Sequence, residues 1–430
     1  MTQRYLVIAD DLTGGADAGA QFAENGFSTF LISFEESHPI DFLKYDCQDI
    51  LVINTDSRAL KPEKAFHLVS SLLKGYDPNL YPVIYKKIDS TLRGNIGYEI
   101  DALIQETNPS VCFVVPSYPE QRRTVVDGIL RVGGDPTASM EISRDVQESH
   151  VCRLLEHQSR NHIGWIGLKD VASGAGELRK RVDEERAQGT PILVFDAVSR
   201  RDLMNIADLA FQLERNPLLV GSAGLAKEVA QRLRSSKSAH DLFTHDGSRL
   251  FKHVFIISGS ASSVTHRQLK QLEGRNVEEF ILPLPWLTTK TIPETEKKEF
   301  SNRVADALSK KHIILRSPLE FLPADLTGSP IHLKIAETLA GLALSAMQES
   351  EMNSYELALI LTGGETAMTV VRLLQAEGIA IERELLEGIM RGYLVGGKWD
   401  HLTVVTKAGA FGEENDLKNV LEILERGNSK

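Results

Sequence analysis

Short aliphatic runs alternate with amphipathic segments along the first half of the chain. The runs that predict buried strands are residues 5–9, 29–33, 50–54, 82–85, 111–115, 162–168, 191–195 and 218–220. Helical spacing of apolar residues predicts helices over 16–25, 62–74 and 177–186. This alternation is typical of an α/β fold, in which parallel strands are joined by helices.

The same pattern returns in the second half. Strands are predicted over 254–257, 280–282, 313–315, 357–361 and 402–405, with helices from 264 to 272, up to 374 and at the end of the chain. Between the halves, residues 235–249 are polar and have no sustained period, which predicts a linker. We therefore expect two domains, 1–240 and 250–430, each a largely parallel sheet flanked by helices.

Length and composition agree with two globular domains. A chain of 430 residues exceeds what one hydrophobic core usually supports, and 42% apolar with 25% charged residues is ordinary for a globular protein. The net charge of -11 argues against nucleic acid as a partner. No apolar run is long enough to span a bilayer and no signal peptide is evident, so we expect no membrane partner and a cytoplasmic location. No pattern predicts an oligomeric state.

Three cysteines lie far apart in the sequence. Cys47, Cys112 and Cys152 include no C-x-x-C pair and are odd in number, which fits neither a disulfide framework nor a zinc site. We expect them to be buried and reduced.

Polar residues gather where three predicted strands of the first domain end. Asp10 and Asp11 precede a pair of glycines, residues 54–58 end in Arg58, and residues 86–95 hold lysine, aspartate, hydroxyl groups and arginine. Ligands of open α/β sheets bind beyond the carboxyl ends of the strands. The candidates for contact with a small, anionic, hydroxyl-bearing substrate are Asp10, Asp11, Arg58, Lys87, Asp89, Ser90, Thr91 and Arg93.

Each of these clusters also has a structural explanation. Asp11 or Thr13 is suited to cap the following helix, which would leave Asp10 solvated. Arg58 is placed to form a surface contact with Asp56, and residues 86–99 to form a solvated loop with an internal aspartate–arginine pair. Because the clusters recur at the ends of neighbouring strands, we favour a functional interpretation of Asp10.

Glycine-containing turns follow three strands of the second domain. Glycine permits close approach of the backbone, hydroxyl groups donate to phosphate oxygens, and a helix N-terminus attracts anions. Three unconnected helix caps are the structural alternative. The predicted phosphate-binding residues are Ser258, Gly259, Ser260, Gly363, Gly364, Glu365, Lys407, Gly409 and Gly412, with Lys407 as the cation for a polyphosphate. The sequence has no Walker-type loop and no G-x-G-x-x-G turn in a strand–helix context.

Taken together, six segments resemble the four-carbon acid sugar kinase family. In order along the chain they are ADDLTGGADAG (9–19), TDSR (55–58), KKIDSTLRGN (86–95), SGSAS (258–262), LTGGET (361–366) and TKAGAFG (406–412). The resemblance implies that the N-terminal domain holds a tetronate such as D-threonate or D-erythronate and that the C-terminal domain binds ATP. It further implies transfer of phosphate to the terminal 4-hydroxyl.

Several expectations follow from the resemblance. The active site is expected in the interdomain cleft, with ATP and Mg2+ as cofactors, Asp10 as catalytic base and Asp89 as the second candidate. Arg58 and Arg93 are expected to hold the substrate carboxylate, and no metal ligands are predicted. The alternatives are a kinase of a 3-oxo-tetronate or a related small hydroxy acid, and a non-catalytic sensor of an acid and a nucleotide.

Overall fold

A computed structural model describes residues 4–136, 148–213, 217–234, 251–260, 262–289, 291–318, 331–409 and 411–426. The chain divides into two compact units, unit 1 from Met1 to Phe243 and unit 2 from Thr244 to Lys430. The predicted linker, residues 235–249, lies outside the described residues.

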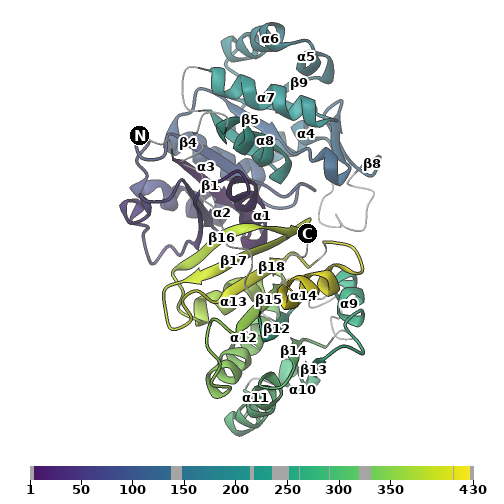
Figure 1. Ribbon diagram of the computed structural model, residues 1–430. Coiled ribbons are helices and arrows are strands. Elements are labelled where there is room, and N and C mark those ends of the chain that lie inside the picture. Colours follow the sequence, from purple (N-terminus) through teal and green to yellow (C-terminus); the bar gives the residue numbers. More distant parts are fainter. Residues whose placement is uncertain are drawn as a thin grey trace. The chain divides into compact units, whose positions relative to one another are not determined.

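Unit 1 is built on one parallel sheet (Figure 1). Each strand pairs in parallel with its neighbours. In spatial order the strands are β2 (Thr29–Ser33), β3 (Ile50–Asn54), β1 (Tyr5–Ala9), β4 (Val83–Lys87), β11 (Leu218–Gly221), β5 (Cys112–Val115), β10 (Ile192–Phe195) and β9 (Ile163–Ile166).

The helices of unit 1 form two groups, and the members of each group pack against one another. One comprises α1 (Leu12–Ala23), α5 (Leu168–Ala172), α6 (Ala175–Ala187), α7 (Arg200–Gln212) and α8 (Ala223–Arg234). The other comprises α2 (Pro62–Leu72), α3 (Ile96–Thr107) and α4 (Val151–Gln158). The chain moves one way along the sheet after β1 and the other way after β3, so right-handed crossovers place α1 and α2 on opposite faces. This reversal creates a topological switch point at β1.

The central strands are buried on both faces. All five residues of β1 are at most 3% exposed, as an uninterrupted aliphatic run between two helix layers requires. Gly15 in α1 permits this packing, because a Cβ there would lie 3.2 Å from the Ala9 Cβ and 3.3 Å from Leu31 Cδ1. The core therefore fixes the end of β1 firmly beneath the switch point.

A small antiparallel sheet in unit 1 was not predicted. Its strands are β6 (Arg123–Val126), β7 (Ile129–Val132) and β8 (Asp135–Pro136), and a short 3-10 turn, η3 (Pro119–Gln121), precedes them. Asp127 and Gly128 join β6 to β7 with φ angles of 52° and 70°. An Asp-Gly pair between two apolar runs is a strong hairpin signal.

Unit 2 contains a mixed sheet (Figure 1). In order its strands are β13 (Val277–Ile281), β14 (His312–Arg316), β12 (His253–Ser258), β15 (Leu357–Thr362), β18 (Thr403–Lys407), β17 (Ile389–Val395) and β16 (Gly378–Leu386). The first five are parallel, and β17 is antiparallel to both neighbours. The predicted fold class, α/β with two largely parallel sheets flanked by helices, is confirmed.

The helices of unit 2 also form two contacting groups. The first comprises α9 (Ser263–Lys270) and α14 (Asp416–Arg426), which pack on a core that includes Phe251, Ile256 and Leu421. The second comprises α10 (Leu284–Thr288), α11 (Glu294–Leu308), α12 (Ile331–Glu349) and α13 (Gly364–Leu373).

Three local predictions were wrong. Helix α1 begins at Leu12 rather than at residue 16, because Asp11 caps it, so the two glycines that follow Asp11 lie within the helix. Strand β4 continues through Lys86 and Lys87, which were expected to lie beyond it. Cys47 is exposed, whereas Cys112 and Cys152 are buried as free thiols.

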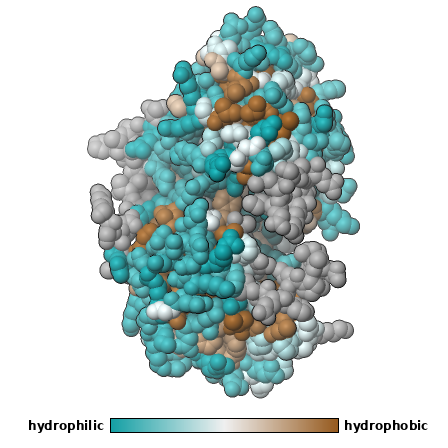
Figure 2. Space-filling model, turned by 90° about the vertical axis from the view of Figure 1, so that its right-hand side faces the viewer, coloured by the Kyte–Doolittle hydropathy of each residue, from teal (hydrophilic) through white to brown (hydrophobic). Residues whose placement is uncertain are grey.

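The surface shows separate hydrophobic patches among hydrophilic residues (Figure 2). Scattered apolar side chains of this kind are normal for a globular surface. Within the described ranges, no helix combines the length and the apolar character needed to cross a membrane.

Candidate functional site

The first site lies in unit 1, where β1, β3 and β4 end side by side. Arg58, from the loop after β3, binds Asp10, the residue after β1, through two parallel hydrogen bonds. Nε donates to Asp10 Oδ2 at 2.8 Å and Nη2 donates to Oδ1 at 2.9 Å. Nη2 also donates to Asp11 Oδ1 at 2.5 Å. The parallel sheet thus brings together two sequence segments 48 residues apart, as the polar clusters predicted.

Burial and charge act in opposite directions on Asp10. Its side chain is almost entirely buried, which alone would raise the pKa of the carboxyl group. The nearby cations Arg58, Lys86 and Lys87 outweigh burial and lower the pKa of Asp10 below its usual value. Asp10 is therefore ionised at neutral pH.

A second aspartate–arginine pair follows β4. Arg93 Nη2 donates to Asp89 Oδ1 and Arg93 Nε to Oδ2, both at 2.9 Å. The Thr91 hydroxyl and the Thr91 and Arg93 backbone N–H groups also donate to Oδ2. Leu92, with φ of 68°, makes the tight turn that directs these groups inward. Burial would raise the pKa of Asp89, but Arg58 and Arg93 hold it well below its usual range.

Lys86 and Lys87 point to opposite faces of the sheet because they are consecutive strand residues. On the α3 side, Lys86 Nζ pairs with Glu99 Oε2 at 2.6 Å. On the α1 side, Lys87 Nζ donates to the Ile88 carbonyl oxygen at 3.0 Å and lies 3.0 Å from the position of a Cβ on Gly14. Only Lys87 faces the helix that follows Asp10.

Arg123, at the start of the unpredicted hairpin, reaches the same site. Its Nη1 donates to the Ser90 Oγ at 2.5 Å and to Gln121 Oε1 at 2.6 Å. The Asp-Gly turn signal would have predicted the hairpin, but no sequence pattern indicates that its first residue contacts Ser90.

The structural alternatives fare differently. Asp11 does cap α1, accepting hydrogen bonds from the Gly14 N–H at 3.1 Å and the Thr13 hydroxyl at 2.6 Å. The predictions of a solvated Asp10 and of a solvated loop around Asp89 are wrong, because both carboxylates are buried. The internal pair of Asp89 with Arg93 is confirmed. The roles of these residues in binding and catalysis stay predictions.

In unit 2, the three predicted glycine turns follow neighbouring strands and contact one another. The Thr362 hydroxyl donates to Ser258 Oγ at 2.7 Å, and the Gly363 N–H donates to the Lys407 carbonyl oxygen at 3.0 Å. A Cβ on Gly409 would overlap Ser260 Oγ and lie 3.1 Å from the Ser260 Cβ. The turns therefore form one continuous backbone surface at the carboxyl edge of this sheet.

Helix α13 presents its N-terminus at this surface. Gly363 has φ of 93° and precedes the first helical residue, Gly364. The first N–H groups of a helix have no intrahelical acceptor, so this end is suited to an anion. Burial raises the pKa of Glu365 in the first turn, partly against His332. Gly412, with φ of 94°, lies farther along, against Asp416 at the start of α14.

Lys407 is turned inward rather than toward solvent. Its Nζ donates to the carbonyl oxygens of Ala408 at 2.9 Å and Gly409 at 3.4 Å, and to the Thr265 hydroxyl at 3.3 Å. Burial lowers the pKa of Lys407 to about 8, partly opposed by Asp416. The ammonium group therefore holds the turn that contains Gly409.

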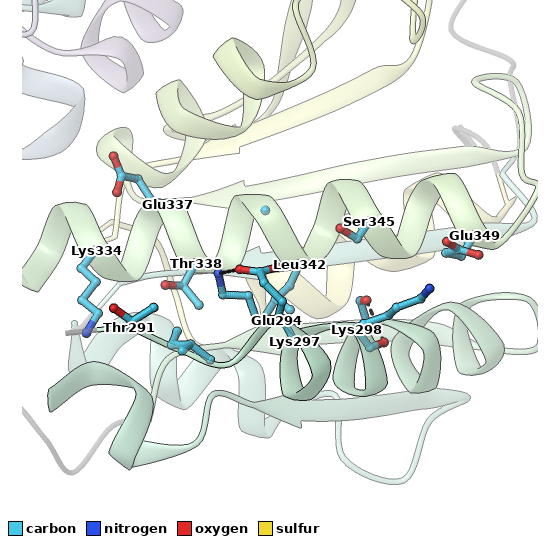
Figure 3. Close-up of a pocket in the computed structure, with 13 residues that line it drawn as sticks. Thr291, Glu294, Lys297, Lys298, Lys334, Glu337, Thr338, Leu342, Ser345 and Glu349 are labelled. Atoms are coloured by element: carbon cyan, nitrogen blue, oxygen red, sulfur yellow. Dashed lines mark hydrogen bonds and ion pairs between the residues drawn. The ribbon is translucent and has the colours of Figure 1, made fainter. Parts of the chain in front are cut away.

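A cavity of about 650 Å³ in unit 2 is separate from these turns. Figure 3 shows it between α11 and α12, with Lys297 and Lys298 on one side and Thr338, Leu342 and Ser345 on the other. None of the predicted site residues lines it. Over the described part of the chain, no group of three histidine, cysteine or carboxylate side chains is placed to hold a metal ion.

Comparison with known families divides the chain where the two units divide. Residues 5–229 match the family model of a sugar-binding N-terminal domain. Residues 255–417 match that of a nucleotide-binding C-terminal domain.

Curated relatives match over nearly the full chain. A D-threonate kinase of Salmonella typhimurium is 30% identical, and the match covers 98% of each chain. A D-erythronate kinase of Heliobacterium modesticaldum is 27% identical over 95% of this chain and 94% of its own. A 3-oxo-tetronate kinase of Actinobacillus succinogenes is 26% identical, covering 95% and 97%. The crystal structure of a Haemophilus influenzae protein matches with a TM-score of 0.72 and 25% identity, covering 97% of this chain and 100% of that one.

We expect Gly409→Ala to destabilise unit 2, because its new methyl group would collide with Ser260. The cost of such overpacking is about 1–3 kcal/mol. Gly341→Ala is the matched control: a Cβ there meets no atom within 4 Å, and alanine favours a helix by about 0.5–1 kcal/mol. Scanning calorimetry of the wild type and both variants measures the melting temperature of each. A melting temperature of Gly409→Ala equal to that of the wild type would contradict the predicted collision.

The lowered pKa of Lys407 predicts a specific pH dependence of stability. An unfolded lysine keeps its proton up to a pH of about 10.4, whereas buried Lys407 loses it near 8. Between these values the unfolded state binds more protons, so the free energy of unfolding rises with pH. Relative to Lys407→Met, the wild type should gain about 2 kcal/mol between pH 7.5 and 9.5 in urea unfolding. If the difference in the free energy of unfolding between the wild type and Lys407→Met does not change with pH, the lowered pKa of Lys407 is contradicted.

Proposed function

The chain belongs to the four-carbon acid sugar kinase family and is a phosphotransferase acting on an alcohol group, and on this premise we propose its reaction. The chain transfers the γ-phosphoryl group of ATP to the terminal 4-hydroxyl of a four-carbon acid sugar such as D-threonate or D-erythronate. Unit 1 holds the acid sugar and unit 2 holds ATP. The sensor hypothesis is set aside by the family assignment.

The observation that carries this proposal is the pair of buried aspartate–arginine contacts after β1, β3 and β4. A guanidinium group binds a carboxylate through two parallel hydrogen bonds, and a carboxylate accepts hydrogen bonds from hydroxyl groups. Arg58 and Arg93 can exchange part of their contacts with Asp10 and Asp89 for contacts with the substrate carboxylate. Lys87, Ser90 and Thr91 supply further donors for hydroxyl oxygens.

Asp10 is better suited than Asp89 to accept the substrate proton. Asp89 accepts five hydrogen bonds from Thr91 and Arg93, four at Oδ2 and one at Oδ1, so its charge is already strongly compensated. Each oxygen of Asp10 accepts one hydrogen bond from Arg58, so a substrate hydroxyl can donate to it. In our proposal Asp10 accepts the 4-hydroxyl proton, and Asp89 fixes Arg93.

In unit 2 the glycine turns are proposed to hold the phosphate groups. The backbone surface formed by the turns at Ser258, Gly363 and Gly409 presents N–H groups and hydroxyls, and the N-terminus of α13 adds a favourable dipole. Lys407 fixes the last turn from beneath. These donors act on the charge that develops during transfer, where electrostatic stabilisation dominates.

Mg2+ would arrive with the nucleotide. This ion prefers oxygen ligands and keeps several waters and phosphate oxygens, so it needs few protein side chains. The oxygen donors of the turns fit it, and the Glu365 carboxylate and the Ser260 hydroxyl would hold it. When bound, the ion would neutralise charge on the β- and γ-phosphates.

The test of the function is an ADP-release assay with Mg-ATP and a panel of acids. The panel contains D- and L-threonate, D- and L-erythronate and the 3-oxo-tetronates, which are the main alternative substrates. A four-carbon acid without the 4-hydroxyl, 2,3-dihydroxybutyrate, is the matched control. We expect turnover with at least one tetronate and none with the control. Turnover with the control would refute transfer to the 4-hydroxyl, and silence with every acid would refute the proposed substrate class.

For the base, we expect Asp10→Asn to lower kcat by about 10²- to 10⁴-fold while ATP still binds, since the amide cannot accept a proton. Asp89→Asn should act mainly by raising KM for the acid, because it releases Arg93. Steady-state kinetics and titration calorimetry with ATP measure both effects. Near-normal turnover by Asp10→Asn would remove Asp10 from the role of base.

A further inference from the structure

A buried ion pair lies directly behind the first aspartate–arginine pair. Lys86 and Glu99 are at most 1% exposed, and their charged atoms are 2.6 Å apart. Glu99 lies in the first turn of α3, on the opposite face of the sheet from α1. The proposed reaction uses neither residue.

This ion pair is connected to the loop that carries Arg58. The Ser57 hydroxyl donates to Glu99 Oε1 at 2.6 Å, while Lys86 occupies Oε2. Ser57 Oγ also lies 2.7 Å from Thr55 Oγ1, which donates to the Ala9 carbonyl oxygen at 2.9 Å. One carboxylate therefore joins the end of β4 to the loop after β3.

The residue before α3 holds the same loop from a second point. Asn95 Nδ2 donates to the carbonyl oxygens of Ser57 at 3.0 Å and Leu60 at 2.9 Å, on either side of Arg58. Gly94, with φ of 103°, lies against the pair itself: a Cβ there would be 3.3 Å from Arg58 Cγ and 3.2 Å from Asp10 Oδ2. The start of α3 thus holds the backbone on both sides of Arg58 and packs against its side chain at Cγ.

Charge makes Glu99 more than a packing residue. If Glu99 were neutral, Lys86 would be a buried cation without its partner, which is strongly unfavourable. Asp10 is close enough for Lys86 to act on its charge. An uncompensated Lys86 would therefore compete with Arg58 for Asp10.

We propose that Glu99 is a positioning residue of the acid-sugar site. It neutralises Lys86 and holds Ser57, and it thereby keeps the Arg58 guanidinium on Asp10 in the place where the substrate is recognised. The kinetic part of this inference rests on the proposed function, whereas its structural part concerns the Arg58–Asp10 contact alone.

Two variants separate the two tasks of Glu99. Glu99→Gln keeps an acceptor for Ser57 but removes the charge opposite Lys86, and Ser57→Ala keeps the ion pair but releases the loop. Asp101→Asn is the matched control, because Asp101 is also a buried carboxylate of α3 but accepts its hydrogen bonds from Ser159, Arg160 and Asn161 instead of from Ser57.

Steady-state kinetics with the best tetronate of the panel should show a selective effect. We expect Glu99→Gln and Ser57→Ala to raise KM for the acid at least tenfold and to change KM for ATP less than twofold. Asp101→Asn should change neither KM, whatever its effect on melting temperature. An unchanged KM for the acid in both site variants would overturn the proposal.

A double-mutant cycle tests whether Glu99 acts through Arg58. If it does, Glu99→Gln should change KM for the acid less than twofold in an Arg58→Lys background, although it changes KM tenfold in the wild type. Additive effects would show that Glu99 acts independently of Arg58 and would overturn the proposal.

Crystal structures keep the two proposals distinguishable. If the wild type phosphorylates no acid, the proposed function fails, and the position of Arg58 in Glu99→Gln decides the present inference. Separation of the Arg58 and Asp10 charged atoms beyond 4 Å supports it, and an unchanged contact overturns it. If Glu99→Gln does not fold, the same criterion is applied to Ser57→Ala.

Discussion

The structure of unit 1 depends on the compensation of charge that has been removed from water. Four carboxylates and four cations lie together at the ends of β1, β3 and β4, and most of them are buried. Burial of an ionised group is costly unless opposite charges and hydrogen bonds replace the lost water. The four carboxylates are those of Asp10, Asp11, Asp89 and Glu99, and the four cations are Arg58, Arg93, Lys86 and Lys87. These eight charges balance one another, and Arg123, which contacts Ser90, adds one further cation before any substrate enters.

The glycine turns of unit 2 compensate a buried charge with dipoles instead of opposite charges. Its three turns contact one another through backbone groups, serine and threonine hydroxyls and glycines that allow close approach. Among the described residues of these turns, Lys407 is the one buried cation. Carbonyl oxygens and a hydroxyl group accept hydrogen bonds from its ammonium group. A surface of neutral donors is suited to a highly charged ligand, whereas ion pairs that can exchange partners suit a small anion with hydroxyl groups.

The sequence allowed prediction of the parallel strands and of the convergence of Asp10, Arg58 and Asp89, because buried parallel strands are uninterrupted aliphatic runs and their carboxyl ends share one edge. The antiparallel strands β6, β7, β8, β16 and β17 were not predicted. It did not allow prediction of which charges pair. Lys86 was placed outside its strand because a buried lysine contradicts strand composition unless its partner, Glu99, is known. The contact of Arg123 with Ser90 likewise depends on the docking of a hairpin, which no local pattern encodes. Tertiary pairing overrode local preference at these positions.

The alternation of Lys86 and Lys87 across β4 has a consequence for how this chain can change. The side chains of a strand alternate with a period of two, so a shift of β4 by one residue would exchange the faces of both lysines. A deletion would place Lys87 opposite Glu99 and leave no lysine beside Gly14, whereas an insertion would place Lys86 beside Gly14 and leave Glu99 without its partner. A point substitution alters one contact, whereas an insertion or deletion of a single residue in β4 would move both lysines and leave one helix layer without its lysine. The register of β4 therefore determines which lysine faces each helix layer.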